Sequence, residues 1–134
     1  MSKTASKPKS RAVEVALAHI EAWNNRDYES ARSGLSDDVH VTVTTTQPTM
    51  PPTDTVGAEE YMRGLVKFGE VVVPGSAQIN GSAGDDRNAL VMVTVKAVFG
   101  PGGPEVPLVG ARLYMLNDNA KIQSEQVVFC VLGQ

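Results

Sequence analysis

Few side chains in this 134-residue sequence are suited to acid–base or metal chemistry. His19 is the candidate general base, because an unperturbed imidazole titrates close to neutral pH. It lies beside the apolar stripe of a predicted helix, where a lone histidine is more often a core or rim side chain bonded to the backbone. His40 is expected on an outer strand face, at the surface or in an interface. Cys130 is expected to be an inert packing residue.

Metal, cofactor and nucleic-acid chemistry have little support in the sequence. Two histidines and one cysteine without ligand spacing cannot make a usual zinc site, so we expect no metal. The segment Gly100-Pro-Gly-Gly-Pro104 reads as a turn between strands and not as a helix-opening phosphate loop, so we expect no cofactor. A formal net charge of −3, from 12 basic and 15 acidic side chains, gives no basic footprint for nucleic acid.

Arg112 and Glu125 are the other two candidate catalytic residues. They lie on predicted strands joined by the Asn117-Asp-Asn119 turn, on the same expected face and near enough for a cross-strand pair. An arginine in an apolar enclosure needs a partner, and Glu125 is the natural one. Either Arg112 orients an anionic or carbonyl oxygen of a ligand while Glu125 fixes its plane, or the two form a satisfied structural ion pair.

The composition predicts one globular domain. It is 42% hydrophobic and 20% charged, and a single cysteine excludes an intramolecular disulfide. The apolar runs are far shorter than the ~20 residues that span a bilayer, and the basic start lacks the apolar region of a secretory signal. We expect a disordered tail over residues 1–10, a domain over 11–134, no membrane association and a cytoplasmic location.

Hydrophobic periodicity predicts three helices in the first half of the chain. The spacing of apolar residues over 11–24 is typical of an amphipathic helix, and Ser10 is placed to cap it. A short second helix is expected after Asp27, its N-cap, with Gly34 as the stop signal. A third helix is expected from residue 57 to about residue 68.

The remaining pattern predicts strands. Valine alternates with polar residues from Val39 to Val43, which indicates a half-buried strand with its valine face inward. The segment from Gln47 to Thr53 contains three prolines and is expected to be a loop that flanks the mouth of a pocket, with Met50 over it. Four antiparallel strands are expected after Glu70. The fold class is therefore α+β, with helices on one face of a strongly curved, mainly antiparallel sheet.

These segments together resemble a known superfamily. Glu21-Ala-Trp-Asn-Asn-Arg-Asp27, then Leu35-Ser-Asp-Asp-Val39, then Gly57-Ala-Glu-Glu-Tyr61 and four C-terminal strands are similar to the nuclear transport factor 2-like (SnoaL-like, ketosteroid isomerase-like) superfamily. The match covers nearly the whole chain after Arg11. The resemblance implies a cystatin-like conical barrel, a pocket between helices and concave sheet, and a dimer through the outer sheet face. It implies no particular reaction, because members differ widely in chemistry.

Two mechanisms known in this superfamily lack their residues here. Alignment with ketosteroid isomerase places His19, Val43 and Arg112 at its tyrosine donor, its catalytic aspartate and its oxyanion-hole aspartate. Valine cannot carry a proton, so steroid isomerisation by that mechanism is not expected. Arg112 could stand for the arginine of limonene epoxide hydrolase, but Tyr114 lies at the neighbouring inward position and Val127 where an acid is needed. That hydrolase activity is disfavoured too.

Strand alternation, taken with the alignment, predicts a mostly aliphatic cup with few polar groups. The expected ligand-binding residues are Trp23, Val43, Tyr61, Leu65, Val95, Tyr114, Val127 and Phe129. Tyr114 either donates a hydrogen bond into the cup or simply packs there. The strand register decides the assignment, because a slip of one residue would turn each strand's set to the other face.

The sequence thus predicts a small-molecule-binding protein, with a cofactor-independent cyclase, isomerase or dehydratase as the enzyme type. The partner would be a small apolar molecule that bears a carbonyl or carboxylate. The alternative is a non-catalytic dimeric binding or interaction module whose cavity is filled by its own side chains. The convex sheet face is too apolar for a bare surface, so a homodimer through it is expected. Its expected residues are Met92, Thr94, Lys96, Val98, Val109, Leu113, Met115, Val128 and Cys130.

Overall fold

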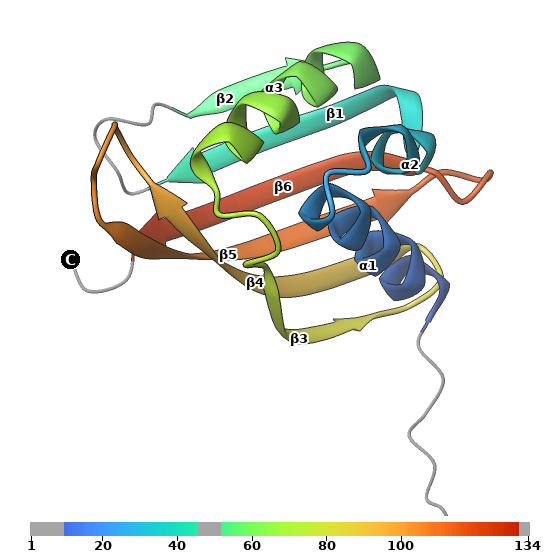
Figure 1. Cartoon of the computed structure of the whole chain (residues 1–134). Coiled ribbons are helices and arrows are strands. Elements are labelled where there is room, and N and C mark those ends of the chain that lie inside the picture. The colour runs from blue at the N-terminus through green and yellow to red at the C-terminus, as the bar shows by residue number, and fades with distance from the viewer. Residues whose placement is uncertain (1–9, 46–51, 132–134) are drawn as a thin grey trace, which may run out of the picture.

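Three helices cover one face of a six-stranded sheet in the computed structural model, which describes residues 10–45 and 52–131 (Figure 1). The helices are α1 (Arg11–Asn24), α2 (Tyr28–Ser33) and α3 (Ala58–Val71). The strands are β1 (Leu35–Thr45), β2 (Thr53–Val56), β3 (Gln78–Gly84), β4 (Asn88–Val98), β5 (Glu105–Leu116) and β6 (Ile122–Val131). The predicted α+β class is confirmed. Of the expected N-terminal tail, only Ser10 lies within the described residues.

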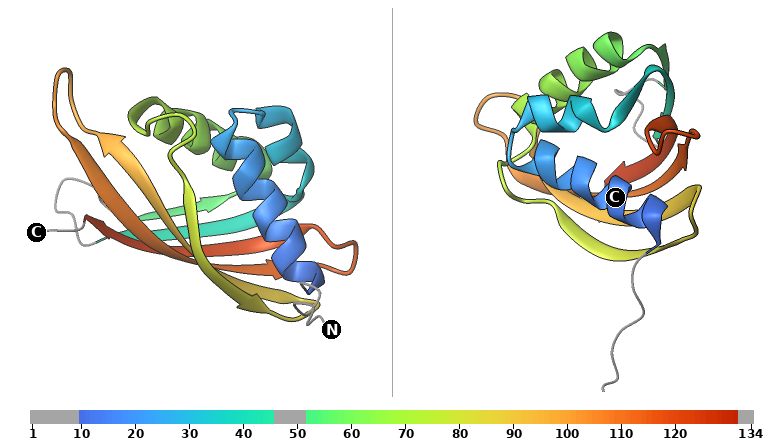
Figure 2. Two further views of the ribbon diagram at one scale, coloured as in Figure 1. Left: turned by 60° about the horizontal axis from the view of Figure 1, so that its bottom comes forward. Right: turned by 90° about the vertical axis from the view of Figure 1, so that its right-hand side faces the viewer.

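The sheet runs in the order β2-β1-β6-β5-β4-β3. Among the described strands, only β1 and β6 pair in parallel, and the other neighbours are antiparallel. Figure 2 shows the strands curving around the helices, so that the concave face of the sheet and the helices enclose the interior. This arrangement confirms the mainly antiparallel, strongly curved sheet that the sequence predicts.

Local signals fixed the first two helices correctly. The Ser10 hydroxyl accepts a hydrogen bond from the Val13 N–H, and the Asp27 carboxylate accepts one from the Ser30 N–H, so both predicted N-caps are confirmed. Gly34 is the C-cap of α2, as expected. The third helix was predicted to end near Phe68 but continues for one further turn to Val71.

One strand was missed. Thr53 was expected to close a proline loop, but it begins β2, which pairs with β1 through Thr53 opposite Val43 and Val56 opposite His40. A strand this short at the edge of a sheet shows too little alternation to be recognised from the sequence. The rest of the expected loop, Met50 included, lies outside the described residues.

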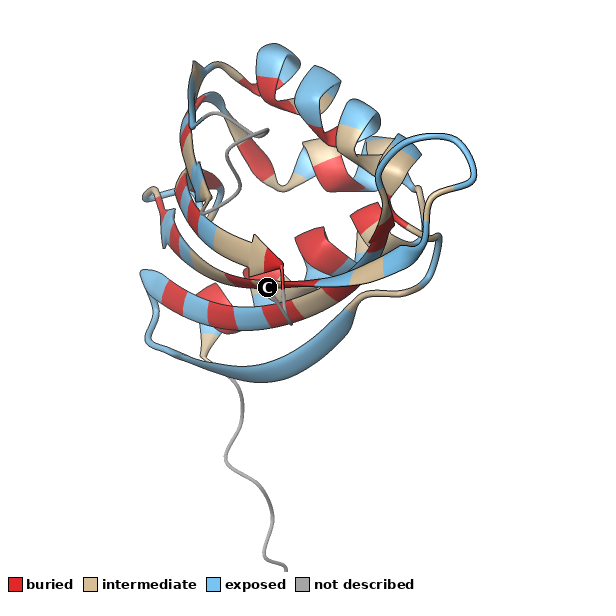
Figure 3. Ribbon diagram, turned by 90° about the vertical axis from the view of Figure 1, so that its left-hand side faces the viewer, coloured by how far each residue is buried: buried red, intermediate tan, exposed pale blue. Residues whose placement is uncertain are grey.

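The inner face of the sheet is the predicted one. In β4, Val91, Val93, Val95 and Ala97 are buried, and the residues between them are exposed or half-buried. Figure 3 shows the same alternation of buried and exposed bands along the curved strands. The period of two therefore sets which side chains enclose the interior.

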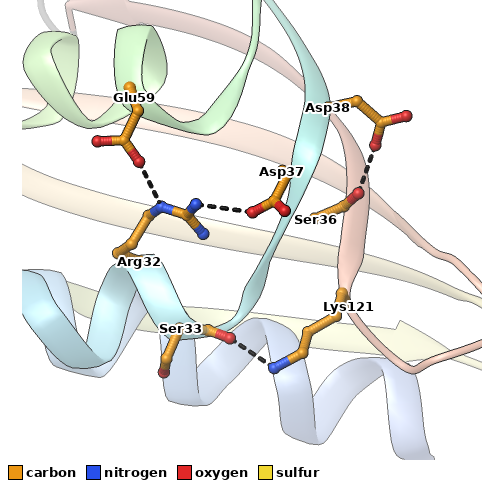
Figure 4. Close-up of polar contacts among 7 residues, drawn as sticks. All are labelled: Arg32, Ser33, Ser36, Asp37, Asp38, Glu59 and Lys121. Atoms are coloured by element: carbon orange, nitrogen blue, oxygen red, sulfur yellow. Dashed lines mark hydrogen bonds and ion pairs between the residues drawn. The ribbon is translucent and has the colours of Figure 1, made fainter.

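Polar contacts tie α2 to its neighbours (Figure 4). The Arg32 guanidinium donates to Glu59 of α3 at 2.9 Å and to Asp37 of β1 at 2.8 Å. The Lys121 ammonium donates to the carbonyl oxygen of Ser33, the last residue of α2, at 2.7 Å. These contacts fix α2, and with it the Ala31 carbonyl that faces the interior.

The two glycines in β3 offer a matched test of packing at the sheet edge. A Cβ at Gly84 would overlap the Asn88 carbonyl oxygen and lie 2.9 Å from the Ala89 Cα, whereas a Cβ at Gly81 would meet nothing within 4 Å. We expect Gly84→Ala to lower the free energy of unfolding by about 1–3 kcal/mol, because overpacking forces the backbone to shift. Gly81→Ala, the control, should leave it within about 0.5 kcal/mol, measured by urea denaturation. Equal effects would contradict the packing argument.

Candidate functional site

A cavity of about 260 Å³ lies between α3 and the concave face of the sheet. Its wall is mostly aliphatic and aromatic, and Arg112, Glu125 and Glu60 are its charged members. The predicted ligand-binding residues that line it are Val43, Tyr61, Leu65, Val95, Val127 and Phe129. A largely apolar wall with a few polar groups is the usual construction of a small-molecule site.

Trp23 and Tyr114, also predicted to bind a ligand, do not line the cavity. The Trp23 indole N–H donates to the Leu65 carbonyl oxygen at 3.2 Å, and its ring stacks on Phe68 with centroids 5.6 Å apart. Trp23 therefore supports the α3 wall from behind. Tyr114 has no exposed surface and stands behind the cavity next to His19, with ring centroids 6.3 Å apart.

Several lining residues were not among the predicted ones. Thr53 and Thr55 come from β2, which the sequence pattern did not reveal, and Gly64 comes from the helical wall. Phe68 also lines the cavity, and its spacing of three and seven residues from Leu65 and Tyr61 is the signal that could have placed it there.

Arg112 and Glu125 share the inner face but are not directly opposite each other. Arg112 pairs with Val127 and Tyr114 pairs with Glu125, so the charged pair is diagonal. Arg112 Nη1 lies 3.9 Å from Glu125 Oε2, with side chains that are 12% and 1% exposed. Arg112 Nε, Glu125 Oε2 and the Tyr114 hydroxyl have no hydrogen-bond partner among the described residues. The two groups thus form the expected ion pair at long range, and each keeps a buried polar atom without a hydrogen-bond partner.

His19 is linked to Glu125 through Tyr61. His19 Nδ1 lies 2.9 Å from the Ala31 carbonyl oxygen, and Nε2 lies 3.3 Å from the Tyr61 hydroxyl. That hydroxyl donates to Glu125 Oε1. His19 is 3% exposed and does not line the cavity. Its hydrogen-bonded route to the cavity runs through Tyr61 and Glu125, and this corrects its assignment as a general base that meets the substrate directly.

Burial controls the protonation of this cluster. It lowers the pKa of His19, although the Glu125 carboxylate acts in the opposite direction. Burial raises the pKa values of Tyr61 and Tyr114 well above the ordinary phenol value, and the Glu125 carboxylate adds to both effects. Both phenols therefore keep their protons at neutral pH, and Tyr61 donates its proton in the hydrogen bond to Glu125.

The other chemically capable side chains lie elsewhere. His40 is exposed, and its Nε2 lies 2.6 Å from Asp54 on the neighbouring strand β2. Cys130 is a free, half-buried thiol.

Within residues 10–45 and 52–131, no group of three or more His, Cys, Asp or Glu side chains could hold a metal ion. In the same ranges no helix is long and apolar enough to cross a membrane.

Solved structures with this fold share little sequence with the chain. An NTF2-like protein of unknown function from Cytophaga hutchinsonii is 18% identical, with a TM-score of 0.65 over 92% of this chain and 94% of that one. An LEH-like epoxide hydrolase from Mycobacterium tuberculosis is 18% identical, with a TM-score of 0.67 over 89% and 82%. RV0760c from M. tuberculosis, in complex with estradiol-17beta-hemisuccinate, is 14% identical, with a TM-score of 0.73 over 89% and 93%.

At these identities the likeness establishes the fold and not the activity. A search of curated proteins finds no significant match to the chain. The sequence profile of the SnoaL-like domain, however, matches residues 16–125, from the first helix to Glu125 itself. The chain therefore belongs to the SnoaL-like domain family, within the NTF2-like superfamily that its segments resemble.

Proposed function

We propose that this protein binds a small apolar molecule that bears a carbonyl or carboxylate group, and that it catalyses a cofactor-independent isomerisation, cyclisation or dehydration of that molecule. The cavity volume of about 260 Å³ is slightly below the roughly 300–1,000 Å³ typical of ligand pockets. A compact ligand fits such a volume. The cytoplasmic location expected from the sequence stays a prediction.

The observation that carries this proposal is a pair of buried polar atoms without hydrogen-bond partners, on two residues that line an otherwise apolar cavity. Arg112 Nε and Glu125 Oε2 are buried, and neither has a hydrogen-bond partner among the residues described. Buried donors and acceptors are costly when unpaired, so a ligand oxygen close to both would relieve the cost. A guanidinium is suited to a carbonyl or carboxylate oxygen, since it presents planar N–H donors and a permanent charge.

The comparisons support the same ligand chemistry. The RV0760c structure holds estradiol-17beta-hemisuccinate, which combines an apolar ring system with a carboxylate. The epoxide hydrolase relative is less informative for the reaction, because Val127 stands where the sequence comparison requires an acid. The alternative of a non-catalytic module with a side-chain-filled interior is less favoured, because the cavity is not filled by its lining residues.

Arg112 should distinguish carboxylate ligands from neutral ones. We expect Arg112→Gln to weaken the binding of hydrocinnamate about 10- to 100-fold, because a hydrogen bond to a charged group contributes about 1.5–3 kcal/mol. Hydrocinnamyl alcohol, the matched neutral probe, should lose much less, and the ketone benzylacetone an intermediate amount. The affinity of each of the three probes is measured by calorimetric titration and by thermal shift. Equal losses for all three probes would remove Arg112 from ligand recognition.

Gly64 offers a way to close the cavity without disturbing the core. It lines the cavity from α3, and a Cβ at this position would meet nothing within 4 Å. We expect Gly64→Leu to abolish hydrocinnamate binding while raising stability by about 1 kcal/mol, because glycine is a poor helix former. Lys67→Leu places the same residue at an α3 position that does not line the cavity and should leave binding unchanged. Retained binding in Gly64→Leu would place the ligand elsewhere.

We also propose that the convex sheet face pairs with a second copy of the chain. Leu90, Met92, Leu113, Met115 and Val128 are 38–55% exposed there. Leu90 lies opposite Leu113, and Val128 lies opposite Ala111, so these side chains form one continuous patch. A patch free of charge is self-complementary, as a two-fold interface requires.

The oligomeric state tests this pairing. Leu113→Glu should turn the dimer into a monomer in sedimentation velocity, because it places like charges in the contact. Val66→Glu, which adds the same charge at a 39% exposed position on α3, should leave the dimer intact. A wild-type monomer at all concentrations would contradict the proposal.

A further inference from the structure

Three buried groups from three separate elements form one continuous polar chain. His19 comes from α1, Tyr61 from α3 and Glu125 from β6, and they are 3%, 8% and 1% exposed. Tyr61 stands between the other two, with its hydroxyl 3.3 Å from His19 Nε2 and bonded to Glu125 Oε1. Tyr61 and Glu125 line the cavity, whereas His19 does not. The chain therefore runs from the cavity wall into the core.

The hydrogen-bond partners fix how many protons this chain holds. A carbonyl oxygen can only accept, so His19 Nδ1, 2.9 Å from the Ala31 oxygen, must carry a proton. The two contacts of the Tyr61 hydroxyl need one proton each, and the phenol supplies only one. The second proton must be on His19 Nε2 or on Glu125 Oε1. The pair is then either imidazolium with carboxylate or neutral imidazole with carboxylic acid, and its net charge is zero in both cases.

The groups around His19 determine which form is favoured. It faces the Ala31 carbonyl of α2, Tyr61 of α3, Tyr114 and Arg112 of β5, and Glu125 of β6. On its own helix the neighbours one turn away are Val15, Ala16, Ala22 and Trp23, none of them charged. Burial and the Arg112 charge lower the pKa of His19, while Glu125 and the Ala31 carbonyl raise it. Burial is the largest of these contributions, and the Glu125 charge is the largest one that opposes it.

We propose that His19, Tyr61 and Glu125 share one transferable proton, which moves through the Tyr61 hydroxyl between Glu125 at the cavity wall and His19 in the core. Tyr61 donates its own proton on one side as it accepts on the other, so the phenol never ionises. Glu125 thereby changes between acid and base with no change in the net charge of the site. His19 is a positioning residue that acts only through Tyr61.

The catalytic role of this relay rests on the proposed function. In the carboxylate form, Glu125 Oε2 accepts a proton from the carbon next to a ligand carbonyl. The C–H electron pair forms the C=C bond of an enolate, and the carbonyl π pair moves onto the oxygen that faces Arg112. Return of the proton from Glu125 to another carbon of the enolate completes an isomerisation. The step needs no oxidant and no added reactant, because the proton and the electron pair stay within the site and the ligand.

The relay can be tested without a substrate, by imidazole nitrogen-15 spectra of the full chain across pH. We expect wild-type His19 to carry its neutral-form proton on Nδ1. Tyr61→Phe removes the hydroxyl link but keeps Glu125, and Glu125→Gln removes the acid. In both variants His19 should stay neutral to lower pH than in the wild type, because its imidazolium loses the bonded carboxylate. His40, exposed and paired with Asp54, is an internal control whose titration should not change.

Tyr114→Phe is the matched control. It removes a buried phenol hydroxyl beside His19 that lies outside the contacts from His19 through Tyr61 to Glu125, so the His19 titration should shift much less than in Tyr61→Phe. If Tyr114→Phe shifted the His19 titration as much as Tyr61→Phe does, the hydroxyl link would not be what sets it, and the relay would be wrong. An unchanged His19 titration in Tyr61→Phe would also overturn the relay. If circular dichroism shows Tyr61→Phe to be unfolded, Glu125→Asp decides, because it keeps the charge but withdraws it from Tyr61. It should titrate like Glu125→Gln, and a wild-type titration would refute the proposal.

The outcome separates this inference from the proposed function. If hydrocinnamate binds but the His19 titration is unchanged in the variants, the relay is contradicted and the proposed ligand site is supported. The expected titration with no binding of any probe would leave the relay and remove the proposed function.

Discussion

The buried Glu125 carboxyl is the group on which the arrangement of this interior depends. It is 1% exposed on an otherwise aliphatic sheet face, and an isolated carboxylate at such a place would be far too costly to bury. The contacts to Tyr61 and Arg112 make its burial tolerable. Because those partners come from α3 and β5, the helix and the strand must hold their positions relative to β6. One unfavourable burial thus constrains three elements.

The same constraint explains why the polar groups are concentrated at one end of the interior. Val91, Val93, Val95 and Ala97 of β4 offer no side-chain partner, so the buried side-chain donors and acceptors that are bonded find their partners on the helices or on neighbouring strands. α2 contributes its Ala31 carbonyl, which is held in place by the Arg32 contacts to Glu59 and Asp37. Surface ion pairs of this kind add little stability by themselves, but here they orient a backbone acceptor.

The part of this molecule that could be predicted from sequence is the part set by local periodicity. The bounds of α1, the caps at Ser10 and Asp27, and the inward faces of the strands follow from spacing that each element shows by itself. These patterns state which way a side chain points and not what lies across from it. Arg112 and Glu125 were therefore placed on one face correctly, while the diagonal offset and the unpaired atoms were not foreseen.

The missed features are those that join distant segments. His19 and Tyr61 are 42 positions apart, and Tyr61 and Glu125 are 64 apart, so no local pattern records their contact. β2 escaped because an edge strand of four residues carries almost no periodic signal. Trp23 was placed at the cavity because helix spacing shows its inward direction but not the depth at which α3 intervenes.

The parallel pairing of β1 with β6 has a consequence for how the protein is made. The strand translated last of the six lies between β1 and β5, in the middle of the sheet. During synthesis the earlier strands emerge with an open seam where β6 will insert, and their apolar faces stay uncovered until it arrives. Closure therefore depends on contacts between remote segments, which slows folding and favours cooperative, late maturation. Until β6 inserts, the uncovered strand faces are the kind of surface that promotes aggregation of partly folded chains.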